Sequence, residues 1–123
     1  MDARKLEQFK KLLLSDLRRH AQNIGEEQAR AIKIDDDAKE SSDLALRDVI
    51  QELALRLGDR ESRVVAEIDQ ALMRMQEGSY GLCVRCGKAI DERRLEAVPT
   101  ARYDAACQTA IEAAKGDGAG PSL

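Results

Sequence analysis

Hydrophobic residues recur every three or four positions along two long stretches of the chain. The apolar row of the first stretch, broken once by Gln28, consists of Leu6, Phe9, Leu13, Leu17, Ala21, Ile24, Ala31 and Ile34. The row of the second stretch, broken once by Arg60, consists of Leu46, Ile50, Leu53, Leu57, Val64, Ile68, Ala71 and Met75. This spacing places apolar side chains on one face of a helix. The pattern therefore predicts two amphipathic helices.

The two predicted helices can bury their apolar faces against each other. Each has about 33 residues, which corresponds to a length of roughly 50 Å. An acidic segment separates them, Ser42 or Asp43 can cap the second helix, and Gly78 is suited to end it. The sequence predicts an all-α fold in which residues 1–78 form a long antiparallel helical hairpin, or coiled coil, with an acidic tip at about 35–45. Two separate helices in a homodimeric bundle are the alternative.

Composition supports long helices and narrows the range of functions. Charged residues make up 35% of the chain, and one Phe and two Tyr are the only aromatic residues, too few for a thick globular core. A net charge of −3 argues against nonspecific binding of nucleic-acid backbone. No apolar run could span a bilayer and no signal peptide begins the chain. We expect a cytoplasmic monomer with no membrane association.

All three cysteines follow Gly78, in residues 79–115, which we expect to form a small second module. Cys83 and Cys86 form a CxxC pair, and after 17 intervening residues Asp104 and Cys107 repeat the spacing. Two pairs at this separation match a four-ligand structural zinc site, and zinc accepts a carboxylate oxygen as well as thiolates. A CxxC pair in a chain without a secretory signal also favours metal or thiol chemistry over a disulfide framework.

Asp104 leaves several interpretations of this module open. Zinc can be held by all four residues, or by the three thiolates together with water or another group. Alternatively, Asp104 only caps the predicted last helix, and the module is free of metal. In that case apolar residues would hold it together, namely Leu82, Ile90, Leu95, Val98 and Ile111. Residues 116–123 have the composition of a disordered tail.

The sequence around the cysteines also resembles that of a known family. The matching elements are Tyr80-Gly81-x-Cys83-x2-Cys86-Gly87, Ile90, Arg94-Leu95, Ala97 and Pro99-Thr100-Ala101. Placed after a long charged helix, this pattern resembles the DksA/TraR family of transcription factors, as a short member with a degenerate zinc finger. The resemblance implies a regulator that inserts its hairpin into the secondary channel of bacterial RNA polymerase. It implies no enzymatic activity and no direct sequence-specific contact with DNA.

The resemblance also assigns roles to residues of the hairpin. The family carries Asp-x2-Asp-x-Ala at the tip, where this chain has Glu40, Asp43 and Ala45. Arg60 is similar to a basic residue of the family that meets the polymerase rim. Without the resemblance, the acidic residues could simply solubilise a loop, and Arg60 could set the register of the coiled coil.

Guanosine tetraphosphate, which some family members bind jointly with the polymerase, is not expected at the family's site here. The family's basic contacts would fall on Glu67, Val98 and Gln108, none of which is basic. A ligand with this many phosphates requires cations or aimed backbone amides.

Two other functions compete with polymerase regulation through the channel. A transcript-cleavage factor also brings acidic residues to the tip of a coiled coil. A thiol-dependent or zinc-dependent redox sensor would use the CxxC pair, because paired cysteines can lower the pKa of a thiol. An active site of the chain's own is not expected, since one His is present and no nucleophile triad or phosphate loop is recognisable.

Overall fold

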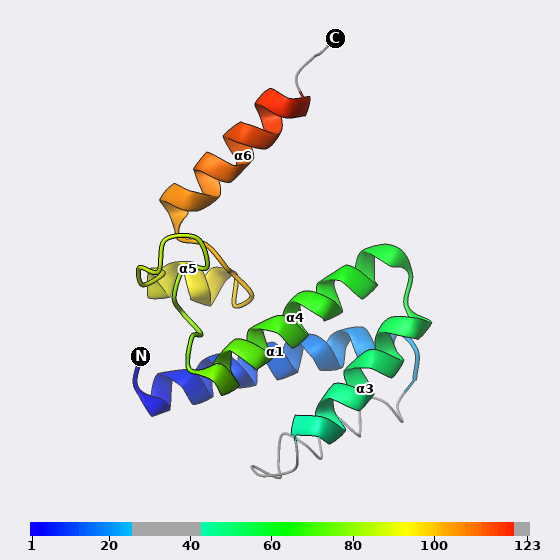
Figure 1. The fold of residues 1–123 in the computed structure, drawn as a ribbon. Helices are drawn as coiled ribbons and strands as arrows, with labels where there is room; N and C mark the ends of the chain where they lie inside the picture. Colours follow the sequence, from blue (N-terminus) through cyan, green and yellow to red (C-terminus); the bar gives the residue numbers. More distant parts are fainter. Residues whose placement is uncertain (26–42, 120–123) are drawn as a thin grey trace.

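The computed structural model describes the backbone of residues 1–25 and 43–119 and the side chains of residues 1–25 and 46–115, and helices form most of this part of the chain. The helices are α1 (Ala3–Gln22), α3 (Asp43–Arg56), α4 (Asp59–Glu77), α5 (Glu92–Ala97) and α6 (Ala105–Ala119) (Figure 1). The predicted all-α class is confirmed. Helix α6 continues to Ala119, past the boundary at residue 115 where the sequence predicted a disordered tail. None of the helices within the described residues is long and apolar enough to cross a membrane.

Helices α1 and α4 form the predicted antiparallel pair. The side chain of Asp2 caps α1 by accepting the Lys5 N–H at 2.8 Å. Helix α4 ends at Gly78, as predicted, because this glycine adopts a left-handed conformation with φ 79°. The far end of α1 contacts the start of α4, where the Asn23 amide donates a hydrogen bond of 3.0 Å to Glu61. The two helices therefore run in opposite directions along their whole length.

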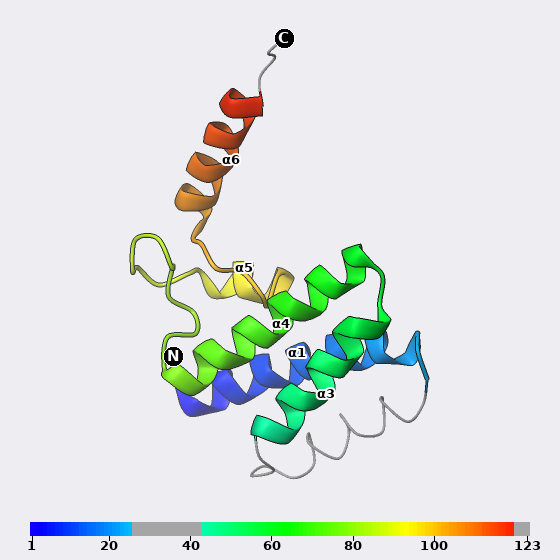
Figure 2. The ribbon, with the colours of Figure 1, turned by 45° about the vertical axis from the view of Figure 1, so that its right-hand side comes forward.

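The second arm of the hairpin is not the single helix that the sequence predicted. It breaks at Leu57 and Gly58, so that α3 turns back and lies against α4 (Figure 2). Glycine weakens a helix interior, and Gly58 instead takes an extended conformation (φ −69°, ψ 167°) as the N-cap of α4. Asp59 and Glu61 then occupy the first turn of α4, where negative charge is favourable. Within the described residues, the result is a bundle made by α1, α3 and α4.

The break also changes which residues of the second row are buried. Val65 is fully buried and Val64 only half-buried, whereas the continuous row predicted Val64 in the core. A new helix start at Asp59 shifts the phase of α4 relative to α3. The fully buried side chains of the bundle come from all three helices and include Leu13, Leu14, Leu17, Leu53, Val65 and Ile68.

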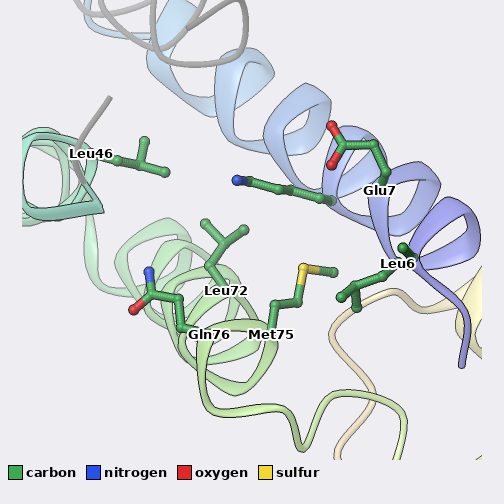
Figure 3. A pocket seen from close by; sticks show the side chains of 8 residues that line it. Leu6, Glu7, Leu46, Leu72, Met75 and Gln76 are labelled. Atoms are coloured by element: carbon green, nitrogen blue, oxygen red, sulfur yellow. The ribbon is translucent and has the colours of Figure 1, made fainter. Parts of the chain in front are cut away.

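The residues that line a groove of about 330 Å³ show which parts of α3 and α4 lie side by side (Figure 3). Leu46, in the first half of α3, lines this groove together with Leu72 and Met75 from the last turns of α4 and Leu6 from α1. The first turns of α3 therefore lie beside the end of α4 that leads into the cysteine module. The sequence pattern instead predicted these turns at the tip of the hairpin, remote from the cysteine module.

Several contacts join the cysteine module to the bundle. The rings of Phe9 and Tyr80 lie 5.9 Å apart between centroids, and Lys5 Nζ forms an ion pair of 2.9 Å with Glu92 at the start of α5. Arg74 of α4 is half-buried and donates a hydrogen bond of 3.4 Å to the carbonyl of Thr100. Burial, followed by repulsion from Arg102, lowers the pKa of Arg74. Beyond this junction, α6 projects away from the bundle (Figures 1 and 2).

Candidate metal centre

A tight loop presents Cys83 and Cys86 on the same side of the backbone. The Cys83 N–H donates to the carbonyl of Lys88 at 2.7 Å, and the Gly87 N–H donates to the carbonyl of Cys83 at 2.9 Å. Gly87 has φ 78°, a value that a residue with a side chain rarely adopts, which is why the loop can close there. An isolated antiparallel bridge between Leu82 and Ala89 completes the loop.

The second half of the centre comes from the start of α6. A backbone hydrogen bond of 2.8 Å from Val84 to Arg102 holds the loop beside the segment that leads into this helix. As a result, the three sulfur atoms and one carboxylate oxygen of Asp104 all lie within 4.8 Å of one another. Thiolates around tetrahedral zinc stand about 3.8 Å apart, given Zn–S bonds of about 2.3 Å. All four residues that the sequence singled out are therefore brought together at a distance that suits a zinc ion.

Asp104 uses its two carboxylate oxygens for different contacts. Oδ1 accepts the backbone N–H of Cys107 at 2.7 Å, which is the N-cap bond of α6. Oδ2 accepts from the Cys86 thiol at 3.1 Å and so faces the sulfur cluster. The sequence left two interpretations of Asp104 open, a helix cap and a ligand, and the geometry of both is present at once.

The backbone around the loop prepares Cys83 to act as a thiolate. Burial by itself would raise the pKa of the Cys83 thiol, but the N–H groups of Cys86, Asp104 and Arg85 point at its sulfur. Together they lower the pKa of Cys83 to about 7. Thiolates are the form in which cysteine binds a metal.

The other two thiols respond to the carboxylate beside them. The N–H of Lys88 lowers the pKa of Cys86. The hydrogen bond to Asp104, burial and the neighbouring thiols Cys83 and Cys107 together outweigh this effect, and the pKa of Cys86 rises to about 12. Burial and then Asp104 raise the pKa of Cys107. Bonds from the Cys107 N–H and the Cys86 thiol hold the pKa of Asp104 below its ordinary value. Without a metal, Cys86 and Cys107 therefore stay protonated beside the Asp104 carboxylate, and zinc would displace their protons when it binds them as thiolates.

The three thiolates and one carboxylate fit zinc better than a hard cation. Thiolates select soft or borderline ions, while magnesium and calcium require oxygen ligands. Four thiolates and this donor set also carry the same formal charge. When bound, zinc would act here as a structural cross-link between the CxxC loop and α6.

Sequence reasoning named the ligands but missed the groups that support them. These are the backbone amides directed at Cys83 and Cys86, and the Arg85 side chain, which lowers the pKa of Cys107. Gly87 directly after the second cysteine was the available signal, because it marks a loop tight enough to turn its amides toward the sulfurs.

The described residues assigned to the tip and arm are not among the four residues of this centre. Glu40 is outside the described residues, and Asp43 and Ala45 belong to the first turn of α3, where only the backbone is described. Arg60 is exposed in the first turn of α4, at the end of the α1–α4 pair that is remote from the module. An exposed position does not match the alternative in which Arg60 sets a coiled-coil register from within the seam.

Glu67, Val98 and Gln108, where the family's contacts with guanosine tetraphosphate would fall, do lie together. They line one shallow groove of about 410 Å³. The basic residues of the same groove are Arg94, Arg102 and Lys115. Arg94 donates through Nε to the carbonyl of Tyr103 at 2.9 Å, and the guanidinium of Arg102 lies 5.6 Å from the centroid of the Tyr103 ring.

Comparison with known proteins places the chain among relatives that share both of its parts. The family model described as "Prokaryotic dksA/traR C4-type zinc finger" matches residues 78–113. An RNA polymerase-binding transcription factor DksA of Caulobacter vibrioides is 35% identical over 108 residues, which cover 88% of this chain and 76% of the relative. An uncharacterised protein of Aquifex aeolicus is 32% identical over 119 residues, covering 94% and 82%.

A solved structure supports the same assignment. The transcription factor DksA2 from Pseudomonas aeruginosa matches with a TM-score of 0.61 and 31% sequence identity, covering 94% of this chain and 88% of that one. The name of the C4-type finger implies four cysteines, and this chain has Asp104 at one of the four positions. With sequence and fold in agreement over nearly its whole length, the chain belongs to the DksA/TraR family.

Proposed function

We propose that this protein binds bacterial RNA polymerase through the secondary channel and modulates transcription initiation with the acidic tip of its hairpin. The observation that carries this proposal is the extent of the likeness to the Caulobacter relative. That protein is named as an RNA polymerase-binding transcription factor, and its match covers 88% of this chain. The likeness includes the helical arms as well as the cysteine module, so it is not limited to a widespread zinc-finger motif.

In this proposal the charged residues of the two arms have separate tasks. Glu40, Asp43 and Ala45 act near the catalytic centre of the polymerase. Carboxylates suit such a site, because they can accept hydrogen bonds or approach magnesium and basic residues. Arg60 is exposed at the end of the α1–α4 pair and is available to contact the rim of the channel.

Delivery of the tip requires α3 to swing away from α4. In the bundle α3 folds back, whereas a channel-inserted hairpin needs α3 to extend α4 past Gly58. The polar contact between the two helices favours this change, although the buried apolar residues of α3 would have to leave the bundle. Arg47 Nε and Asp69 Oδ1 are 3.7 Å apart, and both atoms are buried without a hydrogen-bond partner in the described structure. Such a pair stabilises the closed bundle weakly. We propose that Leu57 and Gly58 act as the hinge.

The proposal also covers the location and the mode of action of the protein. It acts as a cytoplasmic monomer, catalyses no reaction of its own and makes no sequence-specific contact with DNA. Its effect arises from changes in the lifetime of promoter complexes that the polymerase forms.

The experiment that tests the proposal measures two properties of the same variants. Binding of the labelled full-length chain to purified core polymerase is followed by fluorescence anisotropy, and the lifetime of a promoter complex is followed by competitor challenge. We expect Asp43→Asn to bind within about threefold of wild type while losing its effect on complex lifetime. Arg60→Glu should weaken binding, and the matched change Arg63→Glu, also at an exposed position of α4, should not. Absence of binding by wild type would overturn the proposal.

A further inference from the structure

Asp104 stands at the point where the metal centre meets the last helix. It directly precedes α6, and its backbone carbonyl accepts the Gln108 N–H at 2.9 Å while its Oδ1 accepts the Cys107 N–H at 2.7 Å. The first amides of a helix have no partner within the helix, and an N-cap side chain satisfies one of them. Asp104 therefore closes the first turn of α6.

The other oxygen of the same carboxylate takes no part in the cap and is available to bind a metal. Oδ2 points to the sulfur cluster and takes up the Cys86 thiol at 3.1 Å. The proton of that thiol lies between two groups that are both ligands for zinc, so a zinc ion would replace it and join the same two atoms. The cap bond through Oδ1 does not need to break for this to happen.

We propose that Asp104 has two roles: it caps α6 through Oδ1 and supplies the fourth zinc ligand through Oδ2. As a result, zinc binding and the first turn of α6 stabilise each other. A cysteine at this position can provide the ligand but has a poor acceptor for a cap. The carboxylate supplies both because it has two oxygens. The inference rests on the geometry of the cysteine module and is independent of the proposed action on polymerase.

Thermodynamic linkage gives the proposal its measurable content. If zinc binding restrains the carboxylate that caps α6, zinc must reduce the fraction of molecules in which the first turn is open, and opening of that turn must lower the affinity for zinc by the same factor. The amide of Cys107 reports on the cap directly, because its N–H is the one that Oδ1 accepts. Its hydrogen exchange can be followed with and without zinc in the full-length chain.

Variants at position 104 separate the two tasks. Asp104→Asn keeps a side-chain oxygen for the cap but replaces the anionic ligand by a neutral amide. Asp104→Cys keeps an anionic ligand and removes the cap. Zinc affinity is measured by competition with a chromogenic chelator, and exchange at Cys107 by NMR. If one variant fails to fold, the other still tests one of the two roles of Asp104, and loss of either role would overturn the proposal.

We expect Asp104→Asn to bind zinc at least tenfold more weakly than wild type, with exchange at Cys107 unchanged in the metal-free protein. Zinc should slow this exchange in wild type severalfold and have little effect on it in Asp104→Asn. Asp104→Cys should hold zinc at least as tightly as wild type while Cys107 exchanges severalfold faster. Wild-type zinc affinity in Asp104→Asn would overturn the ligand role. Unchanged exchange at Cys107 in Asp104→Cys would overturn the cap role.

Discussion

The hydroxyl of Tyr80 donates a hydrogen bond of 2.7 Å to the backbone carbonyl of Pro99. Tyr80 follows the end of α4 and Pro99 precedes the segment that leads into α6, so this bond fixes the path of the chain on both sides of the cysteine loop. Tyr80 is buried, and its ring lies against Phe9 of α1. One side chain thus connects the bundle, the cysteine loop and the approach to the last helix.

Tyr80→Phe should lower the free energy of unfolding by about 0.5–1.5 kcal/mol at neutral pH, the usual net contribution of one hydrogen bond. Burial raises the pKa of Tyr80 to about 12, above the ordinary value of about 10. Folding therefore favours the neutral phenol, and the stability that depends on it is complete below pH 10 and is lost as the pH rises toward 12. Urea titrations of wild type and Tyr80→Phe at several pH values measure both effects.

The control for this prediction is Tyr103→Phe, which removes the chain's other tyrosine hydroxyl. It should keep the wild-type loss of stability between pH 10 and 12, whereas Tyr80→Phe should flatten it. Equal slopes for wild type and Tyr80→Phe would show that Tyr80 ionises without cost to the fold.

Two leucines two positions apart on α3 test whether this helix packs against the bundle. Leu53 is completely buried, whereas Leu55 is 86% exposed. Leu53→Ala should lower the free energy of unfolding by about 2–5 kcal/mol, as expected for a cavity in a packed core. Leu55→Ala should change it by less than about 0.5 kcal/mol. Chemical denaturation measures both, and similar values for the two variants would contradict the burial pattern of α3.

Much of the helical part of the fold was predictable because each helix carries its own signal. The apolar rows of α1 and α4 and the stop at Gly78 predicted the antiparallel pair. The fold-back of α3 was not predictable, since a row with steps of three and four reads the same through a break as through a continuous helix. Gly58 followed by Asp59 was the local signal for a new helix start. Whether a chain uses such a signal depends on packing with other helices, here on Leu46 and Leu53 against α1 and α4.

The candidate metal site was predictable from spacing, while the arrangement of its atoms was not. Two pairs of residues with the same internal spacing placed Cys83, Cys86, Asp104 and Cys107 together. Spacing cannot tell which oxygen of Asp104 faces the sulfurs or that the other one caps α6. Those contacts depend on the backbone bond between Val84 and Arg102, which links segments far apart in the sequence.

Closure and opening of α3 can be followed as a distance. Spin labels on non-natural amino acids at Asp48 and Gln76 leave the cysteines untouched. In the bundle these positions lie on neighbouring helices, whose axes pack about 8–10 Å apart. In one continuous helix they would be about 42 Å apart. We expect the short distance in the free protein and the long one after core polymerase is added.

A label pair within α4, at Arg63 and Gln76, serves as the control and should not change. Gly58→Ala provides a second test, because a Cβ at this position meets no atom within 4 Å in the bundle, so the substitution acts mainly through helix propensity, by about 1 kcal/mol. It should increase the population with the long distance. A short distance that persists in the polymerase complex would rule out the hinge.

Guanosine tetraphosphate should add less than about twofold to the activity of this protein through a site shared with the polymerase. Glu67 would repel its phosphates, and Val98 and Gln108 add no positive charge to the groove that they line. The measurement is promoter-complex lifetime with a polymerase that lacks any alarmone site of its own. A strong enhancement would contradict this prediction. In that case Glu67→Lys should leave the enhancement unchanged or raise it, and Arg94, Arg102 and Lys115 would be the residues to vary.

The most direct test of the central claim is site-specific crosslinking from the tip to the polymerase. A photoreactive amino acid replaces Ala45 in one full-length variant. In the control variant it replaces Glu112, an exposed residue of α6. With core polymerase, we expect crosslinks from position 45 to the walls of the secondary channel near the catalytic centre, and none there from position 112. Crosslinks from position 45 to the outer surface of the polymerase, or none at all despite binding, would contradict insertion of the tip into the channel.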